Sequence, residues 1–371
     1  TTGVHSRRTR DEHRQSRLLD IDQGHFRVST IDHIKRKVTF VGGWDYQGNC
    51  KRLIEQSAPV LSNVYACPVG TVSAIDQGLV SLGNGRYMIA ADNGFSWEIE
   101  PAYEAVLGTH HMETKVCGVA ASHNRVWLAW DNSVTWSVQG DPWRFVREKV
   151  DVEVWPKHRF ELPQSVKHIA ARQSGGIWVH AGEEVWRVDW DDSNQTFTAS
   201  FAFALSVDKL HMVGVESGVI MVTDEHNLLK YDEIEQTLKP LQDHVMAWDS
   251  WREQAASIVM SEDQIPMVTT TDSELNRCSM SLLNFITEPR ADIPFVYLGN
   301  HRAVFISDHT AYYVSAQDHY IKPLMTAAGN AIALSRQQAM NEEETYTREF
   351  AVAYQPKKEQ DRPQLQVWRL E

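Results

Sequence analysis

A hairpin-like unit recurs along almost the whole chain, and this repeat constrains the fold more than any other feature. The clearest copies are VWLAWDNSVTWSV at 126–138 and YMIAADNGFSWEI at 87–99, and AVFISDHTAYYV at 303–314 shares their frame. Each copy has an apolar segment, a turn opened by Asp, and a second segment with an aromatic residue five positions after the Asp. Self-similarity at a roughly fixed period indicates a repeat architecture.

Weaker copies extend the pattern over nearly all of the 371 residues. Ala181 takes the place of the Asp in one copy, and a last hairpin turns near residue 355. Successive turns are 36 to 50 residues apart, with a mean near 44. We expect each Asp to fix its turn by accepting hydrogen bonds from backbone N–H groups two or three residues later. The predicted turn residues are Asp45, Asp92, Asp131, Asp224, Asp272 and Asp308.

The halves of each hairpin are rich in Val, Ile, Trp, Tyr and Phe, which is the composition of β-strands. About four strands fit in one repeat, and such a small antiparallel sheet buries its faces only by stacking on further copies. Radial stacking closes the array and leaves only short, protected edges. The sequence therefore predicts an all-β fold, a β-propeller with seven or eight four-stranded antiparallel blades. We expect it to span 21–371 and to close by pairing 18–21 or 26–31 with 365–370.

The turn motif resembles a known element. Residues 90–97, AADNGFSW, are similar to the Asp-box of bacterial-neuraminidase-type repeats, S-x-D-x-G-x-T-W, and 129–136, AWDNSVTW, is a weaker copy. In propellers that carry it, the box stabilises turns, usually away from the ligand. The resemblance therefore implies a propeller and does not by itself imply sialidase chemistry. The hairpins are also similar to WD-type and quinoprotein-type blades, without the Gly-His and Trp-Asp signatures of the WD type.

Charge separates the first twenty residues from the rest. Residues 1–20 hold five Arg and three acidic residues, a balance of +2, so the formal net charge of -13 leaves -15 on the remainder. We expect a basic N-terminal tail over 1–20, either solvated or docked on an acidic surface. The acidic body makes nucleic acid and anionic membranes poor partners.

Cysteine usage and hydropathy bear on the compartment. The four Cys show no CxxC spacing, so reduced thiols are expected rather than disulfides or a zinc site. No apolar run approaches the ~18 residues that span a bilayer, and no secretory signal is visible. A cytoplasmic protein is the expectation.

The search for catalytic motifs assigns no catalytic residue, no metal and no cofactor. HExxH, GxSxG, GxxxxGK[ST] and GxGxxG are all missing from the sequence. The HHxE run at 110–113 is either a polar loop or part of a metal pair. The DWDDSN run at 189–194 is either an Asx-rich turn or a calcium loop. The segment FRVS at 26–29 loosely resembles the motif that opens sialidase domains. The resemblance implies that Arg27 binds a carboxylate; the alternative is that Arg27 is an exposed strand residue.

The best binding candidates are Trp248, Trp251 and Arg252, within the off-frame stretch 238–257. Trp and Arg are favoured at binding hot spots, although both Trp could instead fill the gap between two blades. We therefore expect a non-catalytic protein–protein interaction scaffold, a subunit of a larger assembly that binds a protein through propeller loops or rim. The alternative is a glycosidase, sialidase-like or sugar-binding propeller with its site at the central channel. Convergent Arg, Glu and Tyr in the channel would favour the enzyme. The insertions 341–349 and 355–364 are expected to be exposed.

Overall fold

The computed structural model describes residues 159–370 except for 289, 291–292, 325–327, 337–345 and 359–362. Before residue 159 it describes 15–22, 25–32, 37–44, 58–66, 72–78, 86–91, 94–97, 109–111, 116–122 and 125–138, with side chains only within 58–64 and 117–136. The chain divides into two compact units, 1–60 with 370–371, and 61–369.

The first unit contains one three-stranded antiparallel sheet, in the order β1 (Gln15–Asp22), β2 (His25–Asp32) and β3 (Lys37–Trp44). β1 runs across residue 20, where we expected the N-terminal tail to end. β3 comes from the first predicted repeat, and its predicted turn residue Asp45 lies outside the described residues.

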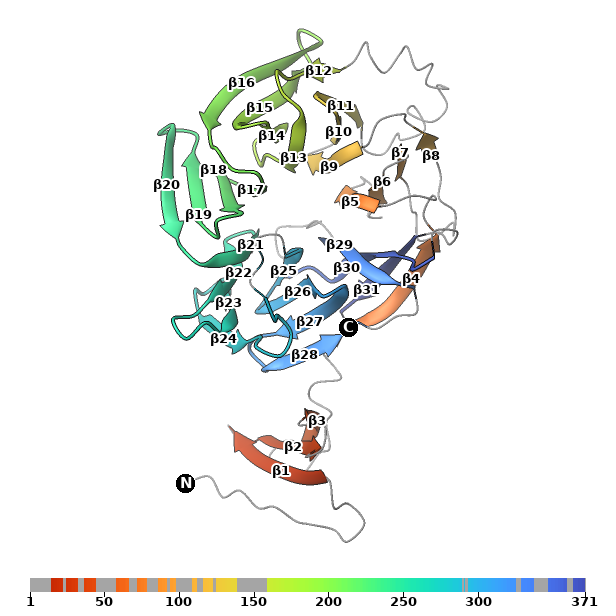
Figure 1. Cartoon of the computed structure of the whole chain (residues 1–371), viewed down its shortest axis with the longest axis vertical. Helices are drawn as coiled ribbons and strands as arrows, with labels where there is room; N and C mark the ends of the chain where they lie inside the picture. Colours follow the sequence, from red (N-terminus) through yellow and green to blue (C-terminus); the bar gives the residue numbers. More distant parts are fainter. Residues whose placement is uncertain are drawn as a thin grey trace. The chain divides into compact units, whose positions relative to one another are not determined.

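The second unit is built from four-stranded antiparallel sheets (Figure 1). Three of them are β9 (Val116–Ser122), β10 (Arg125–Trp130), β11 (Ser133–Val138) and β12 (Phe160–Glu161); β13 (Val166–Ala171), β14 (Ile177–Ala181), β15 (Glu184–Asp191) and β16 (Thr196–Ala204); and β17 (Leu210–Val215), β18 (Gly218–Thr223), β19 (Leu228–Asp232) and β20 (Thr237–Gln242). Three more are β21 (Val245–Trp251), β22 (Gln254–Met260), β23 (Pro266–Thr271) and β24 (Arg277–Ser281); β25 (Phe295–Gly299), β26 (Arg302–Ser307), β27 (Thr310–Ser315) and β28 (Tyr320–Pro323); and β29 (Asn330–Arg336), β30 (Glu349–Gln355), β31 (Gln364–Arg369) and β4 (Val60–Ala66).

A further four-stranded sheet, described in its backbone, joins these. It consists of β5 (Val72–Gly78), β6 (Arg86–Ala91), β7 (Gly94–Trp97) and β8 (Thr109–His111). The first strands of successive sheets contact one another, from β9 through β13, β17, β21 and β25 to β29, and β5 contacts both β29 and β9. The sheets therefore surround a central axis, as Figure 1 shows. The predicted all-β propeller is confirmed.

The predicted count of seven or eight blades needs correction. Six four-stranded blades, rather than seven or eight, are described with side chains in most of their strands, and the sheet β5–β8 is described in its backbone alone. A count of eight is wrong because β3, which comes from the first predicted repeat, belongs to the three-stranded sheet of the first unit. The last hairpin gains its fourth strand from β4, which lies beside β31. Early and late strands were expected to close the ring, but the early one is β4, not 18–21 or 26–31.

The predicted turns occupy the same place in the blade for most hairpins and a different place for one. The Asp131, Asp224 and Asp308 turns each join the second and third strands of a sheet. Asp272 instead joins the third and fourth strands, β23 and β24, so this hairpin was placed one strand out of frame. Asp92 falls between β6 and β7 and lies outside the described residues.

Apolar faces of neighbouring blades form the core. One cluster joins β21–β24 to β25–β28 through residues such as Trp251, Ile258, Tyr297 and Phe305. Similar clusters join β9–β12 to β13–β16, and β13–β16 to β17–β20. The blade β13–β16 thus buries both faces against its neighbours, as repeat stacking requires. In the part of the chain that is described, no helix has the length and apolar character to cross a membrane.

The C-terminal insertions differ from each other. Thr347 and Glu349 are buried, and the Thr347 N–H donates to the Leu298 carbonyl at 2.7 Å. The end of 341–349 is therefore packed against β25, which corrects the expectation of an exposed loop; 341–345 lies outside the described residues. In 355–364, Lys357 and Lys358 are exposed as expected, whereas Pro363 is buried and 359–362 lies outside the described residues.

Candidate functional site

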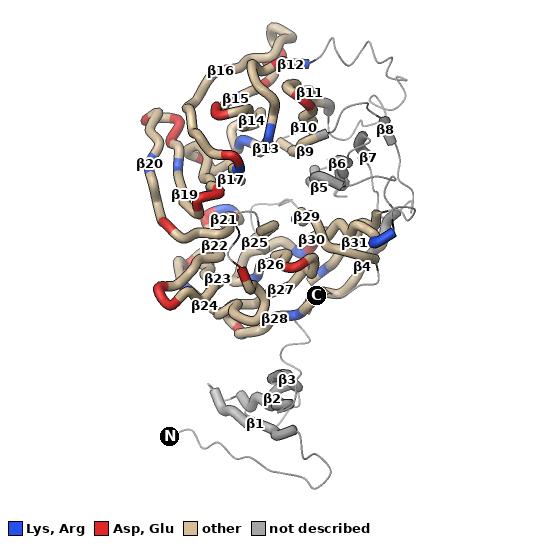
Figure 2. The backbone as a smooth tube through the Cα atoms, in the orientation of Figure 1, with Lys and Arg blue, Asp and Glu red and all other residues tan. Residues whose placement is uncertain are grey.

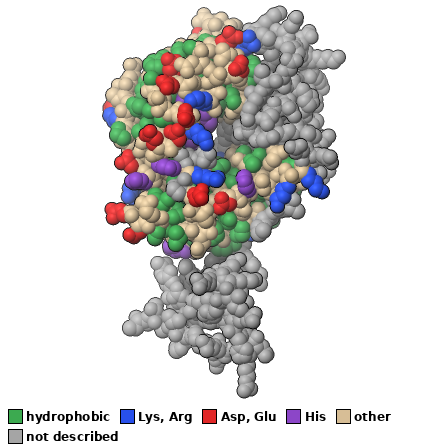
Figure 3. All heavy atoms as spheres, in the orientation of Figure 1, with side chains coloured by type: hydrophobic (Ala, Val, Ile, Leu, Met, Phe, Trp, Pro, Cys, Tyr) green, Lys and Arg blue, Asp and Glu red, His purple; other side chains and the backbone are tan. Residues whose placement is uncertain are grey.

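A cavity of about 1080 Å³ lies at the centre of the ring of inner strands. Residues of β9, β13, β17, β21, β25 and β29 form its wall. Among the described residues the wall carries four basic side chains, three acidic ones and two His: Arg172, Lys209, Arg252, Arg336, Glu216, Asp249, Glu253, His168 and His211. Figure 3 shows Lys, Arg and His side chains gathered near the centre of the face, over β13, β17 and β21. This is the main candidate site.

Arg336, at the end of β29, is held by three neighbouring groups. Its guanidinium pairs with the Asp249 carboxylate, donates to the Tyr297 carbonyl at 2.9 Å and donates to the Ser250 carbonyl at 2.6 Å. Asp249 is itself buried and accepts from the Tyr297 N–H at 2.7 Å. Because β21, β25 and β29 all contribute, this Arg–Asp pair ties three adjacent blades together.

Arg172 follows β13 and is also engaged within the protein. It donates to both carboxylate oxygens of Glu233, at 3.0 and 3.2 Å, and to the Gly175 carbonyl at 3.0 Å. A bidentate Arg–carboxylate contact has fixed geometry and is among the stronger polar interactions. It joins the blade β13–β16 to the blade β17–β20. Two of the four basic side chains in the wall therefore link blades.

His168 and His211 face one another from β13 and β17, with ring centroids 5.4 Å apart. Burial, with a further contribution from the neighbouring His211 and His180, lowers the pKa of His168 to about 3. Burial also lowers the pKa of His211. Both rings are thus neutral near pH 7 and add no charge to the cavity wall.

Two of the three predicted binding residues reach the cavity. Trp251 and Arg252 are in its wall, whereas Trp248 packs with Val222 and Leu228 between two blades. Trp248 and Trp251 are 9% and 4% exposed, on a strand that is buried throughout. The stretch 238–257, expected to be a loop, forms most of β20, β21 and β22. The burial agrees with the packing alternative for both Trp; their binding role stays a prediction.

Arg252 itself is exposed at the two-residue turn between β21 and β22. Its backbone is left-handed, with φ 55°. Its guanidinium lies 5.9 Å from the Trp251 ring, and that of Arg336 lies 5.3 Å from the same ring. Cation–π contacts of this kind hold an Arg over an aromatic face. The predicted candidate is therefore an exposed Arg supported by a buried Trp at the edge of the cavity.

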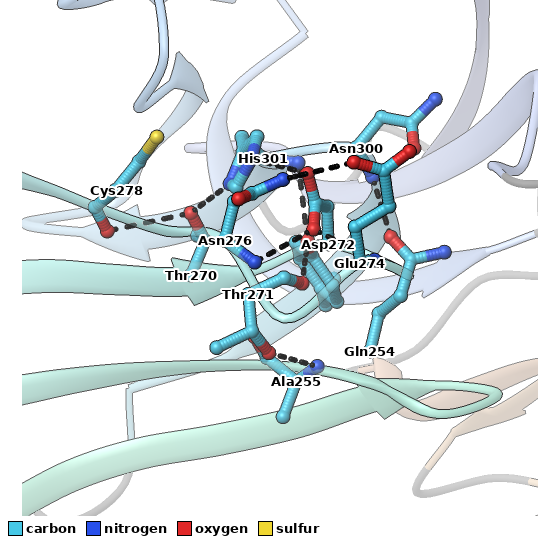
Figure 4. A network of polar contacts seen from close by, with 11 residues as sticks. Gln254, Ala255, Thr270, Thr271, Asp272, Glu274, Asn276, Cys278, Asn300 and His301 are labelled. Atoms are coloured by element: carbon cyan, nitrogen blue, oxygen red, sulfur yellow. Dashed lines mark hydrogen bonds and ion pairs between the residues drawn. The ribbon is translucent and has the colours of Figure 1, made fainter.

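A Thr–His–Asp chain lies outside the cavity (Figure 4). His301 Nδ1 is 2.8 Å from Thr270 Oγ1, and its Nε2 is 3.3 Å from Asp272 Oδ2. Hydroxyl, imidazole and carboxylate in this order resemble a nucleophilic triad. Thr270 is, however, completely buried and His301 is 4% exposed, so no substrate reaches the hydroxyl. The chain joins the blade β21–β24 to the blade β25–β28.

The predicted turn residues work in two ways. Asp272 accepts hydrogen bonds from the Glu274 and Asn276 N–H groups, both at 2.9 Å, as expected. Asp131 and Asp308 instead have left-handed backbones, with φ 50° and 46°, and no described residue donates a hydrogen bond to their carboxylates. Asp224 accepts two longer bonds from the loop before β17.

The weaker metal and substrate candidates give no site in the described residues. In DWDDSN, Asp191 accepts from the Ser193 and Asn194 N–H groups, and Asp192 pairs with Arg125 at 2.5 Å, so this segment is an Asx-rich turn. No group of three potential metal ligands occurs among the residues that were described. The side chains of HHxE and of Arg27 lie outside the described set.

Neither a family model nor a curated protein matches the chain. Solved structures do match. The Neurospora crassa Pan2 WD40 domain is similar over 85% of this chain and 96% of that one, with 11% identity and a TM-score of 0.55. The Cps50 (Swd1) β-propeller domain of Myceliophteria thermophila is similar over 85% of this chain and 100% of that one, with 8% identity and a TM-score of 0.54. A catalytically inactive virginiamycin B lyase from Staphylococcus aureus with quinupristin is similar over 85% of this chain and 100% of that one, with 9% identity and a TM-score of 0.54.

The chain has a β-propeller fold. At these identities the similarity shows the fold alone, and it includes both WD40 domains and an enzyme. It does not show neuraminidase-type Asp-box repeats. The sequence missed Asp249 and Arg336, which are 87 residues apart and carry no local motif. The one local signal for this pair is the acidic Asp249 inside the stretch WDSWR, and that stretch gives no indication of a partner at Arg336.

Proposed function

We propose that the protein is a non-catalytic protein-interaction scaffold, a subunit of a larger assembly, and that a partner protein binds at the edge of the central cavity. The observation that carries this proposal is the engagement of the charged groups in the cavity wall. Arg336 is held by Asp249, and Arg172 by Glu233. An enzyme that binds a carboxylate substrate needs convergent Arg side chains that are available to it, and two of these four basic groups already link blades.

The tyrosines support the same choice. A sialidase-type reaction uses a Tyr nucleophile, which must lose its proton readily. Burial raises the pKa of Tyr297 to about 12, and burial also raises the pKa of Tyr313 and Tyr354. None of these three is in the described cavity wall. No Tyr is among the described residues of the cavity wall, and two of its four basic groups are already engaged, so this wall does not favour the glycosidase alternative.

Arg252 is the proposed contact with the partner. It is exposed at a turn beside the cavity, it is backed by Trp251, and it has Glu253 next to it and Glu216 elsewhere in the same wall. An Arg supported by an aromatic ring has the composition of an interface hot spot. The mixed charge fits a protein segment with both signs better than nucleic acid, which the net charge of -13 also disfavours. We place the complex in the cytoplasm.

The test is affinity capture of the tagged full chain from its host, with the bound proteins identified by mass spectrometry. Arg252→Asn removes the guanidinium and keeps a residue that tolerates a left-handed backbone. We expect it to reduce capture of the specific partner roughly tenfold or more, as for a hot-spot residue. The matched control is Arg277→Asn, an exposed Arg on β24 away from the cavity. Trp248 and Trp251 are poor test positions because truncating buried Trp destabilises the fold.

Two results would count against the proposal. Equal capture by wild type and Arg252→Asn would remove Arg252 as the contact. Cleavage of a glycoside panel by the wild-type chain, abolished by a substitution in the cavity wall, would restore the enzyme alternative.

A further inference from the structure

The outer strands of the propeller differ in how well their free edges are protected. Strands at sheet edges usually carry Lys, Arg or Pro, which discourage pairing with another chain. β20 contains Lys239 and Pro240, β24 contains Arg277, and β28 contains Lys322 and Pro323. β16, TFTASFAFA, has neither charge nor Pro over nine residues. Figure 2 shows this contrast between β16 and β20.

β16 is the last strand in its sheet order, and most of its residues are exposed. It is also longer than β20, β24 and β28. A long, uncharged edge strand presents a row of backbone N–H and C=O groups to any strand of suitable sequence. Among the described outer strands of the sheets β13–β28, β16 is thus the one open to strand addition.

The backbone of β16 is held firmly from the inner side. Phe197 packs edge-on against Trp190 with ring centroids 4.9 Å apart, and Phe201 packs against Trp186 at 6.0 Å. Phe201 nevertheless remains 47% exposed. The edge is therefore pre-organised as a strand, which lowers the entropy lost when a second strand pairs with it.

The sequence of β16 is complementary to itself in the antiparallel direction. A two-fold axis at Ala199 places Ala199 opposite Ala199 of the second copy. It also places Phe197 opposite Phe201 on one face and Thr198 opposite Ser200 on the other. Aromatic pairs and hydroxyl pairs at directly opposed positions stabilise antiparallel sheets. An isologous contact of this kind closes after two copies.

Charge separates β16 from β20, β24 and β28 in the same way, whereas β4 is also uncharged. Strand pairing between two copies at β20, β24 or β28 would bring Lys or Arg of both copies into one small interface, where like charges are unfavourable. At β16 no side chain in the strand carries a charge. With a net charge of -13 on each chain, the neutral β16 adds no like charge of its own to a contact between two copies.

We propose that β16 is a homodimerisation edge: β16 pairs antiparallel with β16 of a second copy about a two-fold axis at Ala199, joining two blades into one continuous sheet. The proposal is independent of the partner proposed at the cavity, since β16 lies at the outer end of its blade and the cavity wall is formed by inner strands.

The experiment measures the molar mass of the full chain by light scattering across a concentration series. Ala199→Lys and Ala199→Glu each place two like charges opposite one another, and each is expected to change the mass from two chains to one. Mixing the two variants places Lys opposite Glu and is expected to restore a 1:1 dimer. Gln242→Lys, at an exposed position of β20, is the matched control and is expected to keep the wild-type mass. Circular dichroism melting checks that all variants are folded.

Four results would overturn the proposal. One is a wild-type chain that stays monomeric at the highest soluble concentration. This includes the case in which β16 pairs with a strand of another protein and not with itself. Another is a dimer that survives Ala199→Lys, which would place the interface elsewhere. A third is loss of the dimer in both variants without recovery on mixing, which would exclude the two-fold register. Open-ended assemblies larger than a dimer would exclude closure.

Discussion

Two buried histidines of the propeller lie in opposite environments. His301 is 4% exposed and has hydrogen-bonding groups at both ring nitrogens, Thr270 and Asp272. His180, on β14, is completely buried and has no hydrogen-bond partner at either ring nitrogen. The Gly182 backbone opposes the lowering of the His180 pKa, but it makes no hydrogen bond to either ring nitrogen. One His therefore joins two blades through hydrogen bonds, while the other is buried without any hydrogen bond from its ring.

The pKa values follow from this difference in surroundings. Burial, together with the positive charge of Lys167, lowers the pKa of His180 to about 4. The partner of His301 shifts as well: the Asn276 side chain, which donates to Asp272, holds the pKa of that carboxyl below its ordinary value. The same residue type thus takes part in a charge-assisted network in one blade and creates an acid-sensitive position in another.

The largest effect is expected from breaking the network at His301. His301→Ala leaves the Thr270 hydroxyl short of a partner in a fully buried site and opens a cavity, so we expect a loss of about 2–4 kcal/mol in unfolding free energy. His301 also has a left-handed backbone, with φ 61°. His301→Asn tolerates that conformation and keeps a polar side chain, so we expect it to lose less than His301→Ala. Urea unfolding at pH 7.5 measures both.

A double-mutant cycle tests whether His301 and Asp272 act together. If the network is a unit, His301→Ala and Asp272→Ala lose less in combination than the sum of their single losses. Strict additivity would contradict the comparison, because it would mean that Asp272 works only within its own turn, through Glu274 and Asn276.

The next largest effect concerns His180 in acid. His180→Leu replaces an unsatisfied ring with an apolar side chain of similar size, and we expect a change within about 1 kcal/mol at pH 7.5. At pH 5 the variant is expected to be more stable than wild type by about 2 kcal/mol. The unfolded His takes up a proton below pH 6.5, whereas the folded His stays neutral down to about pH 4.

The direction of the change in stability with pH follows from these pKa values. Wild-type stability falls as the pH drops through the window from 6.5 to about 4, and His180→Leu removes that fall. His168, with its pKa lowered to about 3, adds a second fall over a wider window. The Asp272 network weakens only at lower pH, below the ordinary carboxyl pKa. Parallel urea titrations at pH 7.5 and 5 provide the measurement. A constant difference between the two proteins would show that His180 is solvated in the folded state.

These environments mark the limit of what the sequence could predict. The repeat predicted the propeller because strand composition and turn spacing are local properties, and Asp131, Asp224 and Asp308 do lie at turns between strands. The partners of His301 and of Arg336 come from other blades, and no spacing rule connects them.

The same limit explains the errors. The frame slipped at Asp272 because β23–β24 has the same local pattern as the second and third strands of other blades. The closing strand β4 could not be recognised, because its pairing with β31 joins positions about 300 residues apart. Trp251 was assigned to a loop because β21 is buried throughout and shows no alternation of polar and apolar residues.

The smallest effect separates the two kinds of Asp turn. At Asp131 the backbone is left-handed and the carboxylate receives no hydrogen bond from any described residue, so we expect the residue to act through its conformational tolerance. Asp131→Ala is then expected to lose about 1 kcal/mol, because Ala lacks the short polar side chain that lets Asp tolerate this conformation. Asp131→Gly, which adopts the conformation freely, is expected to stay within about 0.5 kcal/mol of wild type.

Glycine is the decisive substitution in this pair. It removes the carboxylate as completely as Ala does, so a turn that depends on carboxylate hydrogen bonds would lose at least as much with Gly as with Ala. Asp308→Gly repeats the test at a turn with the same left-handed φ. Asp272→Gly is the opposite control, because its carboxylate accepts the Glu274 and Asn276 N–H groups, and we expect it to be clearly destabilised. Thermal melts of these variants therefore show whether one sequence motif serves two physical purposes. Equal losses for Gly and Ala at Asp131 would return that turn to the side-chain explanation predicted from the sequence.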